Sequence, residues 1–503
     1  MMNQSVDGFR SLSPAEFFYR NRQMAGFGNS TQAVYSAVRE LVENSLDACE
    51  DAQRIPQVKV DLATQSSDIL SIKVADNGTG LPYQKVPEAF GRVLYGSKYD
   101  LKQKRGTFGL GVTMAILYGQ ITTDSPVVVH TQNDSGPGRI YRLLIDIEEN
   151  LPIIENVREE VRPTEGTTVT LTIRGDLKRA WERIVEYIRL STIASPHAVI
   201  DLDFNGNETI RVGGWSKRVP ENPVPSKPHP RSVDLELLRR LIIKSPSKRI
   251  QDFLVDEFQQ LGPRIAKRFL KFIGFNPSIR IESLTRADIT RLSSSLRRFD
   301  GFSRPDSRCL SPIGEEPFLA SIESLFHPSW KQYSRQTTSE WQGYPFFVEG
   351  VIAFGTEFPY VDTPTLYRFA NRVPLVYDAS EDNMTKIVKR LNWKHYGFSM
   401  SLPVALFIHF GSTKVPYRAA GKQSLAHTAD IEVEVTSLIR KLGRALRKHT
   451  GRRDKARRNA RKMREFSEMF DIIAKYGPAL ADAEPPLSTA HMVKSLFEVN
   501  TDV

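Results

Sequence analysis

The spacing of hydrophobic and polar residues in the first part of the chain predicts a mixture of helices and strands. Residues 30–52 place small and apolar side chains on one face at the 3.6-residue period of a helix. That face comprises Val34, Val38, Leu41, Ser45 and Ala48. Further helices are expected at residues 112–118 and 177–192, and strands at residues 57–62, 69–75, 127–130, 141–147, 167–173 and 199–204. We therefore expect this part to form an α/β sandwich.

The pattern changes after this unit. Five prolines among polar residues between Trp215 and Ser232 are typical of a stiff, extended linker. Residues 234–299 then predict short helices, with breaks at Gly262-Pro263 and at residues 274–277. Apolar strands return at residues 346–354, 366–370 and 405–410, and a long helix is expected over residues 430–476. The sequence therefore predicts three folded units joined by a linker.

We place the boundaries of these units from the same pattern. A chain of 503 residues suits about three domains at ~150 residues each. The division is an N-terminal segment (1–17), the α/β sandwich (18–214), the linker (215–232), an all-α domain (233–305), a second α/β domain with a projecting helix (306–476) and a tail (477–503).

Composition and charge narrow the class of protein. Hydrophobic residues at 40% and charged residues at 25% are ordinary for a folded globular chain. Cys49 and Cys309 cannot build a disulfide framework or a four-cysteine zinc site. The apolar run Leu402–Phe410 is far shorter than the ~20 residues that cross a bilayer. We expect neither a membrane partner nor export.

The net charge of +11 suggests a polyanionic partner, and the positive charge is concentrated in one stretch of the chain. Thirteen Lys or Arg residues lie between Arg440 and Arg464, against one acid, Asp454. Like charges at this density repel one another unless an anion neutralises them. We therefore favour contact with DNA along this helix over a merely solvated basic face.

Two polar residues on the first long helix suggest metal-assisted chemistry. Glu40 and Asn44 stand four residues apart and share one face, with Asp47 beside them. Magnesium takes oxygen ligands, often one or two from protein with phosphates and waters supplying the rest, so Asn44 is a candidate ligand. Glu40 is a candidate for polarising a water molecule. For this motif alone, a solvated acidic face is the simpler interpretation.

Two glycine clusters follow. Asp76-Asn-Gly78-Thr-Gly80 ends a predicted strand. Here a carboxylate can accept a hydrogen bond from an amine, and glycines allow the backbone to approach a flat ring closely. By itself, the motif also fits a plain turn. Residues 106–111 precede a predicted helix and would present backbone N–H groups to phosphates. No Gly-Lys-Ser/Thr sequence exists in the chain, which excludes a Walker loop.

Taken together and in this order, these motifs resemble the Bergerat-fold (GHKL) ATPases, which include gyrase B, MutL, the ninety-kilodalton chaperone and histidine kinases. More narrowly, four segments match the B subunits of DNA topoisomerase VI, and the likeness spans nearly the whole chain. These segments are SPAEFF (13–18), RELVENSLDA (39–48), FGRVLYGSK (90–98) and STKVPYRAAGK (412–422).

The resemblance implies a role for each matched position. Glu40 would activate the attacking water, Asn44 would hold Mg²⁺, and Asp76 would bind the adenine amino group with Gly78 and Gly80 beside it. Lys422, from the third unit, would reach the γ-phosphate. The residues implied to enclose the phosphates are Ser97, Lys98, Gly106, Thr107, Phe108, Gly109, Leu110, Gly111, Val112 and Thr113. Threonine at position 113 departs from the lysine of some relatives.

The resemblance also implies an architecture and partners. It suggests a Bergerat-fold ATPase domain, a small all-α helix-two-turn-helix domain, and an α/β transducer domain with a long C-terminal stalk helix. ATP and Mg²⁺ would be the cofactors. ATP would draw two copies together through residues 1–17, and a separate A subunit with the cleaving tyrosine would complete an A2B2 heterotetramer on double-stranded DNA. An amphipathic stretch in the tail, residues 491–499, would dock that subunit.

Other interpretations remain open at this stage. A chaperone-like ATPase clamp would share the nucleotide site but gives no reason for the basic stalk helix. A non-catalytic DNA-binding scaffold would not need the set of Glu40, Asn44 and Asp76. A histidine kinase is the least favoured, because no phosphoacceptor helix is recognisable. The basic residues of the all-α domain suit either DNA contact or a helical spacer. We expect a cytoplasmic, nucleoid-associated protein of a prokaryote, and favour an archaeal host.

Overall fold

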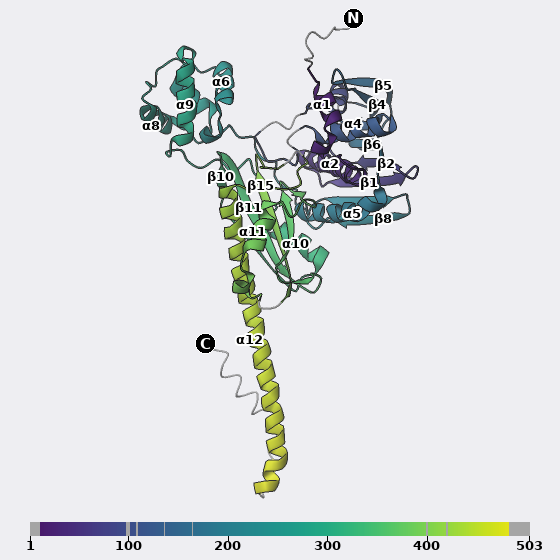
Figure 1. Cartoon of the computed structure of the whole chain (residues 1–503), viewed down its shortest axis with the longest axis vertical. Helices are drawn as coiled ribbons and strands as arrows, with labels where there is room; N and C mark the ends of the chain where they lie inside the picture. The colour runs from purple at the N-terminus through teal and green to yellow at the C-terminus, as the bar shows by residue number, and fades with distance from the viewer. Residues whose placement is uncertain are drawn as a thin grey trace.

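The protein comprises two α/β units and one helical unit, with a long helix running away from them (Figure 1). The computed structural model describes residues 11–96, 101–106, 109–134, 136–162, 164–398, 401–418 and 421–481. Within these residues no helix has both the length and the apolar character needed to cross a membrane.

The first unit is built on a sheet of eight strands in the order β5-β4-β3-β6-β2-β1-β7-β8. Neighbouring strands pair antiparallel, except β1 and β7, which pair in parallel. The strands are β1 (Gln57–Thr64), β2 (Ile69–Ala75), β3 (Val127–Gln132), β4 (Arg139–Asp146), β5 (Leu151–Glu159), β6 (Gly166–Arg174), β7 (Val199–Phe204) and β8 (Glu208–Gly213). Central strands alternate buried residues with partly or fully exposed ones, as expected when one face is covered.

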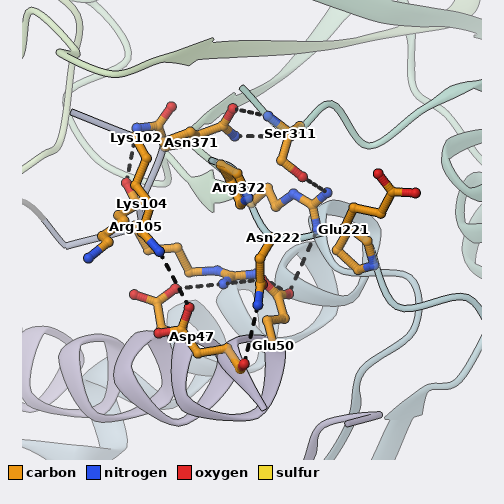
Figure 2. Close-up of a pocket in the computed structure, with 14 residues that line it drawn as sticks. Asp47, Glu50, Lys102, Lys104, Arg105, Glu221, Asn222, Ser311, Asn371 and Arg372 are labelled. Carbon is orange, nitrogen blue, oxygen red and sulfur yellow. Dashed lines mark hydrogen bonds and ion pairs between the residues drawn. The ribbon is translucent and has the colours of Figure 1, made fainter. Parts of the chain in front are cut away.

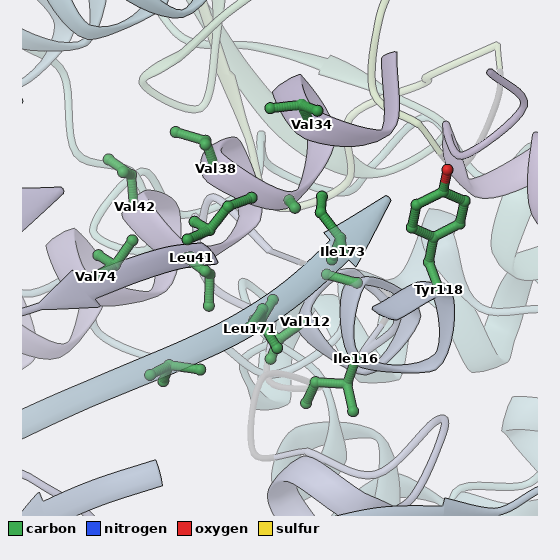
Figure 3. Close-up of a cluster of buried hydrophobic side chains, with 14 of the residues drawn as sticks. Val34, Val38, Leu41, Val42, Val74, Val112, Ile116, Tyr118, Leu171 and Ile173 are labelled. Carbon is green, nitrogen blue, oxygen red and sulfur yellow. The ribbon is translucent and has the colours of Figure 1, made fainter. Parts of the chain in front are cut away.

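Three helices cover the buried face of this sheet: α2 (Ser30–Asp51), α4 (Gly111–Thr123) and α5 (Leu177–Ala194). Asn29 begins α2, since its side chain accepts a hydrogen bond from the Gln32 N–H. Apolar side chains of α2 and α4 meet those of β2 and β6 in one core (Figure 3). Each large side chain buried there contributes about 1.5–3 kcal/mol. The predicted α/β sandwich is confirmed.

Two edge strands were missed by the sequence pattern, and their position explains why. Strand β5 forms one edge of the sheet, and nearly all of its residues are exposed, including Leu151 and Ile154. A strand with no buried face gives no alternation of period two, which is the signal that the other strands carried. Strand β8 forms the opposite edge.

Two short helices flank this core. Helix α1 (Pro14–Arg20) begins at Ser13, whose hydroxyl accepts from the Glu16 N–H and also donates to the Ile147 carbonyl at 2.5 Å. Helix α3 (Val86–Gly91) packs against β4 and β5. The contact between Ser13 and Ile147 ties the start of the described chain to the α/β unit.

The helical unit follows an extended linker. Residues 215–229 form no regular structure, and α6 (Leu235–Lys244), α7 (Ile250–Glu257), α8 (Pro263–Ile273) and α9 (Arg286–Arg298) enclose an apolar core of their own. Thr285 and Asp288 form a capping box at the start of α9. Helix α8 ends at Gly274 in the left-handed conformation, as the sequence break predicted.

The third unit has a second sheet, in the order β10-β11-β15-β13-β14, with β9 paired to β11 and β12 to β15. Its strands are β9 (Trp330–Arg335), β10 (Ser339–Trp341), β11 (Tyr344–Phe354), β12 (Tyr360–Val361), β13 (Thr365–Ala370), β14 (Val373–Pro374) and β15 (Leu402–Ser412). Helices α10 (Glu315–Phe326) and α11 (Asn383–Arg390) pack beside it.

The long helix α12 spans Ala429–Ala481, and its 53 residues measure about 80 Å at 1.5 Å per residue. Its first part packs on the second sheet through a helical stripe of buried residues: Ile431, Val435, Leu438, Ile439, Leu442 and Leu446. The part from residue 451 onward is exposed almost throughout and projects beyond the sheet (Figure 1). The helix passes its expected end at Tyr476 and continues through Gly477-Pro478, a pair that commonly ends a helix. The docking stretch at residues 491–499 lies outside the described residues.

Candidate nucleotide site

Glu40 lies in the buried middle of α2, where the sequence pattern had suggested a solvated face. Its side chain is 9% exposed, and it pairs with two cations from different parts of the chain. Arg39 Nη2 lies 2.5 Å from Glu40 Oε1, and Lys422 Nζ lies 3.5 Å from Glu40 Oε2. Lys422 also donates to Glu43 Oε2 at 2.9 Å. Two carboxylates and two cations therefore form one buried cluster.

This cluster fixes the charge state of Glu40. Burial alone would raise the pKa of Glu40, but the charges of Lys422 and Arg39, with their hydrogen bonds, outweigh it and lower the pKa to about 2. Burial likewise opposes the charged form of Lys422, yet the nearby Glu40 and Glu43 carboxylates raise its pKa. At neutral pH the pair is therefore an ionised carboxylate and an ammonium group.

Lys422 reaches Glu40 from the third unit, across more than three hundred residues of sequence. It is 4% exposed and adopts a left-handed backbone conformation, with φ +52°. The carbonyl of its neighbour Gly421 accepts a hydrogen bond from Arg39 Nη1 at 2.8 Å. The loop is therefore held on α2 by both its backbone and its side chain.

Asn44 stands one turn after Glu40 and is exposed. Asn44 therefore lies at the surface of α2, where a ligand could reach it. Among the described residues no group of three or more His, Cys, Asp or Glu residues could hold a metal by itself. A divalent ion here would need oxygens from a nucleotide, as Mg²⁺ sites commonly do.

Asp76 follows β2 and is buried beneath Gly78. Its Oδ1 accepts from the Gly78 and Thr167 N–H groups at 3.0 and 3.1 Å, and its Oδ2 accepts from the Ser45 hydroxyl at 3.0 Å. Burial raises the pKa of Asp76, although these hydrogen bonds work in the opposite direction. The carboxylate is held in one orientation by α2 and β6 together.

Glycines around Asp76 mark close backbone approaches. A Cβ added to Gly78 would stand 2.8 Å from that of Ala48, and one on Gly80 would stand 2.1 Å from the Gln132 carbonyl oxygen. Gly80 also has φ +65°, a conformation that other residues rarely adopt. Glycine at these two positions therefore lets the loop after Asp76 pack directly against α2 and the end of β3.

The glycine-rich loop ends at the start of α4, directly beside Glu40. A Cβ on Gly111 would stand 1.7 Å from Glu40 Oε2. The first N–H groups of a helix carry a partial positive charge and lack partners within the helix, so this end is suited to phosphate. The Thr113 hydroxyl donates back to the Leu110 carbonyl at 3.1 Å, so this side chain is turned into the helix. Gly106, Gly109 and Val112 are described, whereas Ser97, Lys98, Thr107 and Phe108 lie outside the described residues.

The segment that leads into this loop is held by Arg105, which the sequence reasoning missed. Its guanidinium donates to both carboxylate oxygens of Glu50, at 2.6 and 2.8 Å, and to Asp47 Oδ1 at 2.7 Å (Figure 2). Burial would raise the pKa of Glu50, but Arg105 and a hydrogen bond with His197 lower it well below the usual range. The signal in the sequence was the repeated acid on α2: Glu40, Glu43, Asp47 and Glu50.

Comparison with known proteins supports this arrangement of units. A family described as "Topoisomerase VI B subunit, transducer" matches residues 305–462, and one described as "Histidine kinase-, DNA gyrase B-, and HSP90-like ATPase" matches residues 29–177. The first covers the second sheet and much of α12, and the second covers most of the α/β unit that holds Glu40, Asn44 and Asp76.

Curated relatives match across almost the whole chain. The B subunit of type 2 DNA topoisomerase 6 from Saccharolobus islandicus is 40% identical over 478 residues, which cover 93% of this chain and 89% of the relative. Proteins of the same description from Saccharolobus shibatae and Saccharolobus solfataricus are 40% and 39% identical over the same share of each chain. The chain therefore belongs to the family of topoisomerase VI B subunits, the nucleotide-binding, ATP-hydrolysing subunits of type IIB DNA topoisomerases.

Proposed function

We propose that this chain is the ATP-operated clamp of its topoisomerase, with Glu40 as the base of hydrolysis and Lys422 as the sensor of the γ-phosphate. One observation carries the proposal. A carboxylate, a lysine from the third unit and the first turn of α4 meet at one point, because Gly111 has no side chain to keep them apart. An anion placed at that helix end would lie next to both the proposed base and the proposed sensor.

The remaining residues fit a purine nucleotide. Asp76 would accept a hydrogen bond from the adenine amino group, with Gly78 and Gly80 beside it. The backbone of residues 106–113, with Ser97 and Lys98, would enclose the phosphates. Asn44 would hold Mg²⁺, which neutralises phosphate charge and orients the leaving group when it is bound.

The charge cluster suggests how Glu40 is activated. A general base works best when its pKa lies near the working pH, and two cations now hold that of Glu40 far below it. If Lys422 turns from Glu40 towards a phosphate, one of these two charges is removed and the pKa of Glu40 rises. Glu40 would then take a proton from water more readily, and the third unit would move with Lys422.

We propose that this movement drives the clamp. ATP would bring two copies together through residues 1–17, of which the described part holds α1 on the α/β unit. The stalk helix α12 would carry the motion to a separate, tyrosine-bearing A subunit in an A2B2 heterotetramer, which cuts, passes and reseals double-stranded DNA. Such coupling requires ATP to have a higher affinity for the closed arrangement than for the open one.

DNA contact is assigned to the exposed basic part of α12. Its residues from Gly451 to Arg464 are all exposed, so their charges are available to a polyanion. We also propose that the basic helices of the all-α domain contact DNA. The tail would dock the A subunit. The archaeal source of the curated relatives agrees with the proposed location on an archaeal nucleoid.

Replacement of Glu40 by Gln tests the base. We expect Glu40→Gln to bind ATP but to lower kcat by about 100-fold or more, because the amide cannot accept the proton. Phosphate release measures turnover, and equilibrium binding of an ATP analogue measures affinity. Glu182→Gln, at an exposed position of α5 in the same domain, is the matched control. Turnover of Glu40→Gln at the rate of the control would show that Glu40 is not the base.

Replacement of Gly111 by Ala tests the contact between α4 and Glu40. The added methyl group would overlap the Glu40 carboxylate, so we expect kcat to fall by about 10-fold or more while the domain stays folded. Gly262→Ala is the control, because a methyl group there meets no described atom within 4 Å. Equal phosphate-release rates for the two variants would contradict the proposed geometry.

The salt dependence of DNA binding tests whether the stalk helix α12 contacts DNA. We expect duplex DNA to raise ATP hydrolysis, and the logarithm of DNA affinity to fall linearly with the logarithm of salt concentration. Removal of two phosphate contacts in Arg457→Gln/Arg458→Gln should reduce that slope by up to about 1.8. The exposed pair Lys217→Gln/Arg218→Gln, in the linker, should leave it unchanged. Identical slopes for both pairs would argue against DNA contact on α12.

A further inference from the structure

Two loops of the third unit each place a cation on the same helix of the ATPase domain. Lys422 contacts Glu40 and Glu43 near the middle of α2. Arg372, from the turn between β13 and β14, lies 3.7 Å from Glu50 near the end of the same helix. The carboxylates of α2 follow one another at intervals of three, four and three residues, so they share one face. We call Glu40, Glu43, Asp47 and Glu50 the acidic stripe.

Arg372 occupies a turn that does not favour it. Asn371 and Arg372 are the two central residues, and both have positive φ, +46° and +66°. A turn of this kind favours Asn followed by Gly, because glycine has no Cβ to strain the backbone. Arginine in the second position therefore needs a reason beyond the turn itself.

The contacts of its side chain supply that reason. Arg372 is 5% exposed, and Nη2 donates to the Ser311 hydroxyl at 3.0 Å and to the Pro312 carbonyl at 2.9 Å. Its backbone N–H donates to His409 Nε2 at 3.0 Å. The guanidinium thus joins the end of α2 to the chain that enters the third unit (Figure 2).

The same turn also holds the root of the glycine-rich loop. The Asn371 amide donates to the Lys104 carbonyl at 2.9 Å, and the next residue, Arg105, pairs with Glu50 through both of its carboxylate oxygens. Glu50 is therefore shared between the loop root and Arg372 (Figure 2). A shift of the turn would act on the loop and on α2 together.

We propose that Arg372 is a positioning residue that anchors the third unit on Glu50 and thereby sets the place of Lys422 relative to Glu40. The inference rests on the roles proposed above for Glu40 and Lys422. Glu40 and Glu50 are ten residues apart, which corresponds to about 15 Å along the helix. An apolar core shared by α5 and the third unit holds the two units together, and the two ionic contacts fix where the Lys422 loop lies along α2. When Lys422 turns to a phosphate, the contact between Arg372 and Glu50 would still hold the third unit on α2.

A role in packing alone makes a different prediction. A buried ion pair often adds little net stability, and the loss of one partner weakens the fold generally. Such a loss would lower the melting temperature and would add to the effect of any change at Lys422. Positioning acts through Lys422, so its effect should disappear when Lys422 is already absent.

The test is a double-mutant cycle on the full chain, assembled with its A subunit. Arg372→Gly suits the turn and removes the side chain, so we expect a folded protein whose affinity for an ATP analogue changes by less than about 2-fold, while kcat falls by about 10-fold. In the Lys422→Ala background the same change should lower kcat by less than about 2-fold. Arg372→Lys, which keeps the charge, should restore part of the loss.

Gln342→Gly is the matched control, because Gln342 is exposed and has φ +50° in the turn between β10 and β11 of the same unit. It should leave kcat unchanged. An unchanged kcat in Arg372→Gly would overturn the inference, and so would losses that add to those of Lys422→Ala. Glu40→Gln is run in parallel: its turnover at the wild-type rate would overturn the proposed function itself, independently of Arg372.

Discussion

The acidic stripe on α2 is the feature on which the rest of the structure depends. Four carboxylates on one helix face, at least two of them almost fully buried, cannot be accommodated without cations beside them. The cations come from three places: Arg39 on the helix itself, Arg105 at the root of the glycine-rich loop, and Lys422 and Arg372 from the third unit. Breaking a buried pair by removing one partner costs roughly 3–5 kcal/mol. The ATPase domain and the third unit are therefore joined by ion pairs along α2.

This constraint links chemistry to movement. The residue proposed to activate water and the residue proposed to sense phosphate are partners of each other, so neither can change its contacts without affecting the other. Gly111 brings the first turn of α4 against the same carboxylate. A ligand at that helix end would compete with Glu40 and Glu43 for Lys422. Competition for one buried ammonium group is a simple way for a small molecule to shift a domain.

Much of the architecture could be predicted from the sequence, because the central elements have strong periodic patterns. The helix from Ser30, the strands with one buried face and the helical unit with its glycine breaks all appear close to the predicted places. Edge strand β5 has no buried face and gave no signal. The end of α12 was placed too early, because Gly477-Pro478 is a pair that commonly ends a helix and this helix continues past it.

The contacts within the candidate site were harder to predict from the sequence than the fold. Motifs identified Glu40, Asn44, Asp76 and Lys422, but they could not show that Lys422 would contact Glu43 or that Glu40 would be buried. Arg105 and Arg372 carry no local motif, because their partners lie far away along the chain. Regular spacing of the acids on α2 was visible, yet the cations that match it become apparent only in three dimensions.

The most direct measurement is a crystal structure of the chain with a non-hydrolysable ATP analogue and magnesium. The account predicts that the terminal phosphate lies at the start of α4, with the Lys422 ammonium group on it and the Glu40 carboxylate facing it. A terminal phosphate bound elsewhere, or a Glu40 carboxylate turned away from it with Lys422 still on Glu43, would contradict the account.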